Sequence, residues 1–182
     1  MRCSWAENAD AAMQTYHDTE WGVPHRDPRA LFELISLEGA QAGLSWRTVL
    51  ARREAYRTAY HGFDIERVAA MTDDDLTGVL TGSGVIRHRL KVFSVRDNAR
   101  AALAVGDLDA YLWSFVDGIR TVNHWTVPGQ VPATTPVSDR MSKALKKAGF
   151  RFVGSTICYS LMQASGMVDD HLIACECKGT VR

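Results

Sequence analysis

The sequence predicts an all-α fold, and three observations support this prediction. Apolar residues recur every three or four positions through most of the chain, whereas alternating strand patterns are scarce. Several of these periodic segments open on an aspartate or a serine, which are preferred at helix N-caps. The chain has 182 residues, 46% hydrophobic and 23% charged, which suffices for one well-buried core. No internal repeat, low-complexity stretch or obvious linker interrupts it.

Two helices are expected within residues 29–60. In the first, Leu31, Leu34 and Ile35 recur at helical spacing until glycines interrupt the pattern. Ser45 is a suitable N-cap for the second, the run WRTVLARREAYRTAY that follows it.

Further helices are expected downstream, most of them opening on a capping residue, at 64–71, 73–80, 88–105, 138–150, 156–166 and 171–175. Ser138 is the expected cap of the helix 138–150, and Asp169 that of the last turn. The proline-rich stretch 126–137 is expected to be a loop.

Composition restricts the location and the partners. The first residues, MRCSWAENADAAMQTYHD, are polar and lack the apolar region of a secretory signal. No apolar run approaches the ~20 residues that cross a bilayer, so a cytoplasmic protein without a membrane partner is expected. The net charge of zero argues against a protein that coats nucleic acid by bulk charge, but leaves room for a local basic face.

Cysteine and histidine residues near the two ends suggest a metal site, because cysteines in a reducing compartment favour metal over disulfides. His171 and Cys175 lie four residues apart, so on a helix both side chains share one face. Zinc prefers imidazole nitrogen and thiolate sulfur in four-coordinate structural sites, and Cys3 and His17 can supply the other two ligands. The alternatives are that these residues pack as ordinary core or surface side chains, or that Cys177 competes with Cys175.

The segment 82–91, GSGVIRHRLK, is expected to connect two helices through glycines. Such a turn can point successive backbone N–H groups outward, and a helix N-terminus beside it favours phosphate. Arg87, Arg89 and Lys91 add positive charge nearby. A solvated helix face is the alternative interpretation of these charges.

Aromatic residues gather in the first quarter of the chain. Trp5, Tyr16, Trp21 and Trp46 accompany Glu38, a carboxylate on the apolar face of a predicted helix. Such a carboxylate usually has a partner or a task. Rings with one carboxylate suit a flat, positively charged heterocycle, which they bind by stacking and cation–π attraction. The alternative is that the rings are core and Glu38 is half exposed.

Five segments closely resemble the bacterial 3-methyladenine DNA glycosylase I family: YHDTEWGVP (16–24), LEGAQAGLSW (37–46), GVIRHRLK (84–91), SKALKKAGFRFVGSTICYSLMQASG (142–166) and DDHLIAC (169–175). The similarity runs in order from Cys3 to Cys177, so chance does not account for it. The resemblance implies a helix-hairpin-helix DNA glycosylase fold in a single domain, 1–182.

The resemblance also implies the internal organisation of this domain. A central helical part spans about 27–137 and carries the hairpin near 82–91. The terminal segments 1–26 and 138–182 form a lobe in which bound zinc joins the two ends of the chain.

The resemblance further implies roles for individual residues. One structural Zn²⁺ per chain is bound by Cys3, His17, His171 and Cys175. In the substrate pocket, Glu38 is the catalytic residue, Glu38 and Tyr16 contact the base, Trp46 stacks on it, and Trp21 and Trp5 complete the wall. The residues expected at the DNA are Gly43, Leu44, Gly84, Val85, Ile86, Arg87 and Lys91, with Leu44 as a wedge.

The implied function is hydrolysis of the N-glycosidic bond of 3-methyladenine in double-stranded DNA, without strand cleavage. Base flipping would bring the lesion to Glu38, which recognises its exocyclic amino edge or its charge. We expect a bacterial monomer associated with the nucleoid through DNA, with no nucleotide cofactor. The alternatives are a non-catalytic module that binds alkylated DNA, and a zinc-stabilised protein-interaction domain.

Two positions depart from the pattern of this family. The interval from Cys3 to Tyr16 is about one residue longer than in familiar members, which affects the arm that supplies the zinc ligand. Leu90 replaces a glycine expected beside the hairpin, and we expect it to alter local packing.

Overall fold

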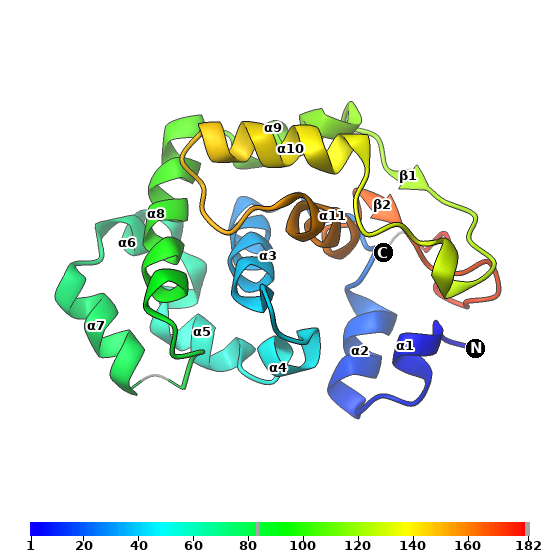
Figure 1. Cartoon of the computed structure of the whole chain (residues 1–182), viewed down its shortest axis with the longest axis horizontal. Coiled ribbons are helices and arrows are strands. Elements are labelled where there is room, and N and C mark those ends of the chain that lie inside the picture. Colours follow the sequence, from blue (N-terminus) through cyan, green and yellow to red (C-terminus); the bar gives the residue numbers. More distant parts are fainter. Residues whose placement is uncertain (83, 181–182) are drawn as a thin grey trace.

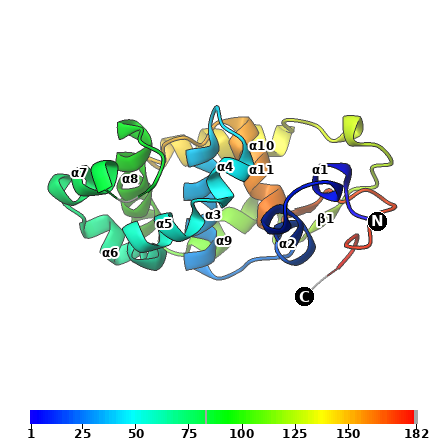
Figure 2. The same ribbon diagram turned by 90° about the horizontal axis from the view of Figure 1, so that it is seen from below.

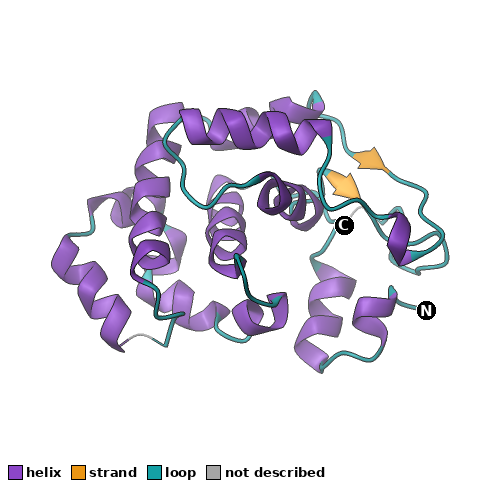
Figure 3. Ribbon diagram, in the orientation of Figure 1, coloured by secondary structure: helices purple, strands orange, loops and turns teal. Residues whose placement is uncertain are grey.

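The computed structural model describes residues 1–82 and 84–180. Ser83, inside the predicted hairpin segment, and Val181 and Arg182, at the end of the predicted domain, lie outside the described residues. The described chain is almost entirely helical (Figures 1 and 3), which confirms the predicted fold class.

The α-helices of the described residues are α1 (Ser4–Glu7), α2 (Ala11–Thr19), α3 (Pro28–Gln41), α4 (Trp46–Leu50), α5 (Arg53–Ala59), α6 (Ile65–Ala70), α7 (Asp73–Gly82), α8 (Arg89–Val105), α9 (Leu108–Trp113), α10 (Pro136–Lys147) and α11 (Ser155–Ala164). Short 3₁₀ helices are η1 (His61–Phe63), η2 (Ser114–Val116) and η3 (Pro128–Gln130). The strands are β1 (Thr121–Val122) and β2 (Val168–Asp169).

Helix α3 is the centre of the molecule. Asp27 caps it by accepting from the backbone N–H of Ala30 at 2.7 Å, and Pro28 occupies its first turn. All ten residues from Leu31 to Ala40 are buried, so this helix is enclosed on every side. It packs against α4, α8, α9 and α11, and Figures 1 and 2 show it between α8 and α11. A residue on α3 therefore has a firmly fixed position.

The predicted helix after Ser45 is two helices, α4 and α5. Ser45 is the cap as predicted, because its hydroxyl accepts from the N–H of Thr48 at 3.2 Å. The N–H of Arg52, however, bonds to the carbonyl of Val49 at 2.9 Å. This tighter i to i−3 bond ends α4 and turns the chain into α5.

The start of α10 also differs from the prediction. Thr135 is the cap, and Ser138 occupies the third helical position, where the two residues form a reciprocal capping box with bonds of 3.1 and 2.8 Å. Pro136 is compatible with the first helical turn because its missing N–H needs no partner there. The helix therefore begins inside the stretch 126–137 that its prolines mark as a loop.

The end of the chain is not helical, which corrects the prediction for 171–175. Just before this segment, strand β2 pairs in parallel with β1, with Thr121 opposite Val168. This two-stranded sheet is a small exception to the all-α prediction. Asp169 accepts from the N–H of His171 at 3.1 Å, but turns follow rather than a helix. The backbone of Asp169 is already engaged, since its carbonyl accepts from Asn123 at 3.1 Å.

The predicted hairpin lies between α7 and α8. Gly84 has φ +79°, a conformation that strains any residue with a Cβ atom. Val85 is buried beside it and anchors the turn, and His88 caps α8 by accepting from the N–H of Lys91 at 3.3 Å. In the described part of the chain, no helix is both long and apolar enough to cross a membrane.

Candidate active site and metal centre

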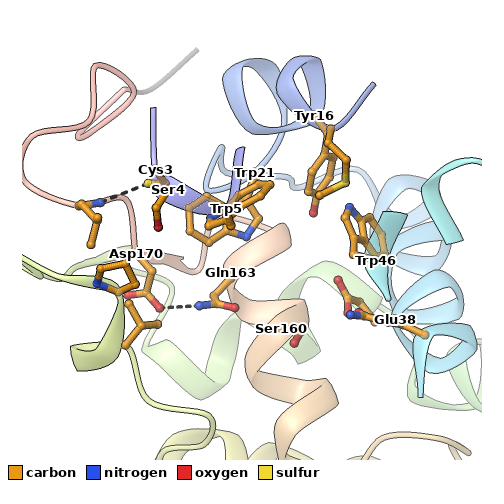
Figure 4. A pocket seen from close by; sticks show the side chains of 15 residues that line it. Cys3, Ser4, Trp5, Tyr16, Trp21, Glu38, Trp46, Ser160, Gln163 and Asp170 are labelled. Carbon is orange, nitrogen blue, oxygen red and sulfur yellow. Dashed lines mark hydrogen bonds between the residues drawn. The ribbon is translucent and has the colours of Figure 1, made fainter. Parts of the chain in front are cut away.

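A cavity of about 370 Å³ opens between the N-terminal helices, α3, α4 and α11 (Figure 4). All five residues of the predicted pocket line it: Trp5, Tyr16, Trp21, Glu38 and Trp46. They come from five separate places in the sequence and converge only in the folded chain. Gln41 joins them from the end of α3.

Glu38 is the most unusual side chain of this cavity. It lies on α3 and is only 3% exposed, and its Oε2 atom has no hydrogen-bond partner among the described residues. Burial raises the pKa of this carboxyl to about 8. The group is therefore held without a compensating charge, next to an open space.

Tyr16 and Trp46 lie at the same end of the cavity as Glu38 (Figure 4). Their ring centroids are 5.0 Å apart at 44°. The indole N–H of Trp46 is buried without an acceptor among the described residues. Burial, and then the charge of Glu38, raise the pKa of the Tyr16 hydroxyl well above its usual range. This end of the cavity offers flat apolar faces, one carboxyl and two donors.

Trp5 and Trp21 form a separate aromatic pair. Their rings meet edge-on at 5.1 Å, and they pack on the two histidines of the terminal segments. The Trp21 ring lies 4.7 Å from that of His171, and the Trp5 ring lies 5.1 Å from that of His17. These tryptophans thus line the cavity on one side and cover a second buried site on the other.

That second site is a group of four candidate metal ligands, the metal cluster, which consists of His17, His171, Cys175 and Cys177. One ligand atom from each lies within 4.8 Å of the others, so the group can hold a metal ion. It joins α2 to the C-terminal turns, as predicted for a clasp between the two ends. His171 and Cys175 meet through turns, not through the helical spacing that suggested them.

Cys3, the remaining predicted ligand, is not a member of this group of four. It lies beside the cluster, where its Sγ accepts from the N–H of Leu172 at 3.4 Å. Its own N–H points at Nε2 of His17 at 3.3 Å. Burial, together with neighbouring Cys175 and Cys177, raises the pKa of its thiol to about 12. With Cys3, five side chains that can bind a metal ion therefore lie around the same buried position.

Carboxylates orient both histidines of the cluster. Nδ1 of His17 contacts Asp18 at 2.8 Å, and Nδ1 of His171 contacts Asp169 at 2.9 Å. The Nε2 atoms therefore face the cluster interior, where that of His17 lies 3.6 Å from Sγ of Cys175. Nε2 of His171 is buried with no partner in the described structure. This is the arrangement of metal-bound histidines, so the residues fit a metal.

Positive charges hold these two carboxylates. Arg2 bonds to Asp18 at 2.9 and 2.8 Å, and this bond holds the pKa of Asp18 at about 2. Burial alone would raise the pKa of Asp169, but bonds from His171 and the N–H of Gly179 lower it to about 2. Both carboxylates are ionised and can fix the imidazole orientation.

A surface groove connects two of the predicted DNA-contacting regions. It is lined by Leu44, Thr48, Arg52 and the hairpin residues Gly84, Val85, Ile86 and Arg87. Leu44 is 42% exposed, on a turn where Gly43 has φ +76°. The α3–α4 turn and the hairpin therefore present one continuous surface.

Lys91 was expected at the DNA and Leu90 in the local packing, and the structure places both side chains differently. Lys91 is buried, and its ammonium donates to the carbonyls of Ala40 and Ala42 at 2.9 and 2.5 Å. The first turn of α8 directs this side chain inward, away from the surface position that a phosphate contact requires. Leu90 is 67% exposed, so it does not alter local packing.

Asp170 is a pocket residue that the sequence did not indicate. It is 2% exposed and accepts four hydrogen bonds, from Tyr159, Gln163, Asn123 and Trp125, at 2.6 to 2.8 Å. It lies at the end of the cavity opposite Glu38 (Figure 4). Its position directly before His171 was the only available signal, because its partners are scattered along the chain.

The fold places the chain in a class of proteins, the DNA base glycosylases. A crystal structure of 3-methyladenine DNA glycosylase I superposes with a TM-score of 0.95 and 49% identity over 98% of this chain and all of that one. The 3-methyladenine DNA glycosylase I of Staphylococcus aureus, studied for its recognition of 3-methyladenine, superposes with a TM-score of 0.95 at 33% identity, over 100% of this chain and 98% of that one.

Sequence similarity narrows this class to one family. Residues 5–178 match the family model of the methyladenine glycosylases, and the chain belongs to that family. The DNA-3-methyladenine glycosylase 1 of Escherichia coli (strain K12) is 48% identical over 180 residues, which cover 97% of this chain and 96% of the relative.

Proposed function

We propose that this protein is a DNA glycosylase that hydrolyses the N-glycosidic bond between 3-methyladenine and deoxyribose in double-stranded DNA. One observation carries the proposal: Glu38, a buried carboxyl whose Oε2 has no hydrogen-bond partner among the described residues, lies beside Tyr16 and Trp46 at an open cavity. Membership of the methyladenine glycosylase family supports the same substrate.

The chemistry of the lesion explains why few catalytic groups are needed. Methylation at N3 gives the adenine in DNA a positive charge, which makes it a good leaving group. When the bond from the sugar to N9 breaks, its electron pair passes to the base and neutralises it. Water then adds to the sugar cation and loses a proton. The protein must evert the base, hold it and exclude undamaged adenine.

Glu38 supplies this selectivity in our proposal. Its carboxylate accepts from the exocyclic amino group or balances the charge of the methylated base, while the Trp46 ring stacks on the base. In a dry cavity such an interaction is stronger than in water. Because the departing base is neutral, the carboxylate stabilises the bound cation more than the product. Glu38 need not act as a general base.

Strand cleavage is not expected. A glycosylase that cleaves the strand uses an amine to form a Schiff base with the sugar. Among the described residues that line the cavity, there is no lysine. We propose release of the base with the abasic strand left intact, by a monomer.

We propose a structural zinc site at this place, with Cys3, His17, His171 and Cys175 as its ligands and Cys177 outside the ligand set. The orientation of the histidines supports Cys3 over Cys177. Sγ of Cys177 lies 4.0 Å from Nδ1 of His17, the nitrogen that bonds to Asp18, and not on the Nε2 side. Four protein ligands would leave no open position for water, so zinc would join the chain ends without taking part in hydrolysis.

The groove completes the DNA interface. We propose that Leu44 on the Gly43 turn enters the duplex as a wedge, that the backbone of Gly84, Val85 and Ile86 binds a phosphate, and that Arg87 adds charge. Exposure of Leu44 and Arg87 on one groove supports this arrangement.

A direct assay tests the function. The protein is incubated with DNA alkylated by a methylating agent, and the released bases are separated and quantified. We expect free 3-methyladenine and uncut strands until the abasic sites are cleaved chemically. Salt-sensitive binding of methylated DNA without base release would instead identify a non-catalytic binding module. No binding at all would favour a protein-interaction domain.

A further inference from the structure

Lys91 is a buried cation that the proposed reaction does not use. It lies in the first turn of α8 and is 8% exposed. Its ammonium donates to two backbone carbonyls, those of Ala40 and Ala42. No described carboxylate forms an ion pair with it, and burial lowers its pKa. A lysine that loses hydration in this way must be compensated by those carbonyls.

The position of this lysine is unfavourable for its own helix. A positive charge in the first turn of α8 opposes the helix dipole. At the end of α3, by contrast, the last carbonyls lack intrahelical partners and carry partial negative charge. Lys91 therefore caps a helix other than its own, one that lies 49 to 51 residues earlier in the chain.

The segment that Lys91 caps is central to the proposed site. Between the two bonded carbonyls lies Gln41, whose own carbonyl accepts from the N–H of Leu44 at 2.6 Å. This turn follows Glu38 and leads through Leu44 to Trp46. Figure 1 shows that α3 and α8 lie side by side, with this turn and the hairpin at the same end of the pair.

We propose that Lys91 is a positioning residue that holds the hairpin and the α3–α4 turn in a fixed relation. When the hairpin binds the DNA backbone, this link places Leu44 and the mouth of the cavity opposite the everted base. The inference rests on the proposed function, because it concerns how duplex DNA is presented to the pocket. Without the link, the pocket and the hairpin each remain intact but are no longer aligned.

The test replaces Lys91 with methionine, an unbranched side chain one atom shorter than lysine, which removes the hydrogen-bond donors. The control is Lys147→Met, a loss of the same charge from an exposed position on α10, on the other side of the molecule from the hairpin (Figure 1). Each variant is compared with the unchanged protein in three measurements: binding of free 3-methyladenine, binding of undamaged duplex over a range of salt, and single-turnover excision from duplex DNA.

Only excision is expected to change in K91M. We expect the single-turnover rate to fall by about 10- to 100-fold, because misplacement by about 1 Å is sufficient for such a loss. Binding of the free base and of undamaged duplex should match that of K147M. Lys91→Arg, which keeps both donors, should retain most of the rate.

Other outcomes overturn the proposal. Wild-type excision by K91M would show that the link is dispensable. If Lys91 contacts a phosphate, affinity for undamaged duplex falls and the slope of log K against log salt changes by about 0.9. If K91M fails to fold, K91Q is measured in the same way, and equal losses in all three measurements would show a purely structural role. Absence of base release by the unchanged protein contradicts the proposed function instead.

Discussion

The metal cluster and the cavity both bury polar atoms, but they treat those atoms differently. Around the cluster, each histidine Nδ1 meets a carboxylate, and each carboxylate meets a cation: Arg2 for Asp18, and Arg120 for Asp169. In the cavity, Oε2 of Glu38 and the indole N–H of Trp46 have no partner among the described residues. The cluster has oriented histidines that can hold an ion, whereas the cavity keeps unpaired hydrogen-bonding groups next to open space.

Burying Glu38 without a partner has a free-energy cost. Holding Glu38 ionised at a pKa of about 8, compared with 4.5 in water, costs on the order of 5 kcal/mol. A cationic ligand that enters the cavity offsets this cost, whereas a neutral adenine does not. This cost would favour the cationic base over undamaged adenine in the proposed function.

Glu38→Gln removes the charge and keeps the shape, and it should have the largest effect on excision. We expect kcat/KM to fall by about 10²- to 10³-fold, because the variant lacks the charge that stabilises the positively charged base and transition state. Excision at the normal rate would remove Glu38 from the mechanism. Glu66→Gln, an exposed change on α6, is the matched control.

The same substitution should not destabilise the fold. Because the folded protein holds a proton on Glu38 that the unfolded chain loses near pH 4.5, the contribution of Glu38 to wild-type stability declines as pH rises from about 4.5 to about 8. E38Q lacks this decline. Its melting temperature should therefore equal or exceed that of the wild type at pH 8, as thermal unfolding at several pH values would show.

Substitutions of the tryptophans on the two sides of the cavity should have different effects. Trp46→Leu removes the ring beside Glu38, and excision should fall by about 10- to 100-fold, the value of one base–aromatic stack. Its melting temperature should change little. Trp21→Leu removes a ring that packs on His171, and it should lower metal retention and melting temperature more than W46L does. Equal behaviour of the two variants would contradict the separation of cavity and cluster.

The pH dependence of excision should follow the ionisation of Glu38. Because the ionised carboxyl is the form that stabilises the cation, kcat/KM under limiting substrate should rise by up to about tenfold per pH unit below pH 8 and level off above it. In E38Q this dependence should vanish. A profile that falls between pH 6 and 8 would show that the protonated acid is the active form.

Metal removal should affect excision least and stability most. Dialysis against a chelator should lower the melting temperature by about 10 °C, the shift expected from the loss of a few kcal/mol. Below the new transition, excision should fall only about twofold, since Trp5 and Trp21 lose their backing but Glu38 does not. Loss of all activity with an unchanged melting temperature would instead place the metal in the reaction.

Local patterns were sufficient for most helices, whereas the roles of the residues at the two sites came from the family resemblance. Helical spacing and N-caps identified α3, α6, α8 and α11, because these signals join residues only three or four positions apart. Residue types raised a pocket at Glu38 and a metal site at the chain ends only as interpretations beside ordinary core packing. In both cases a buried polar group of that kind needs a partner wherever it lies.

Tertiary packing decided what depends on distant parts of the chain. Lys91 resembles a surface cation until α3 places two carbonyls beneath it, and residues 171–175 have helical spacing until Asp169 is engaged by Asn123. The position of Cys177 beside His17, His171 and Cys175 is of the same kind. The direction of a side chain and the nearest donor are set by which elements pack together, and that information is not present in any single segment.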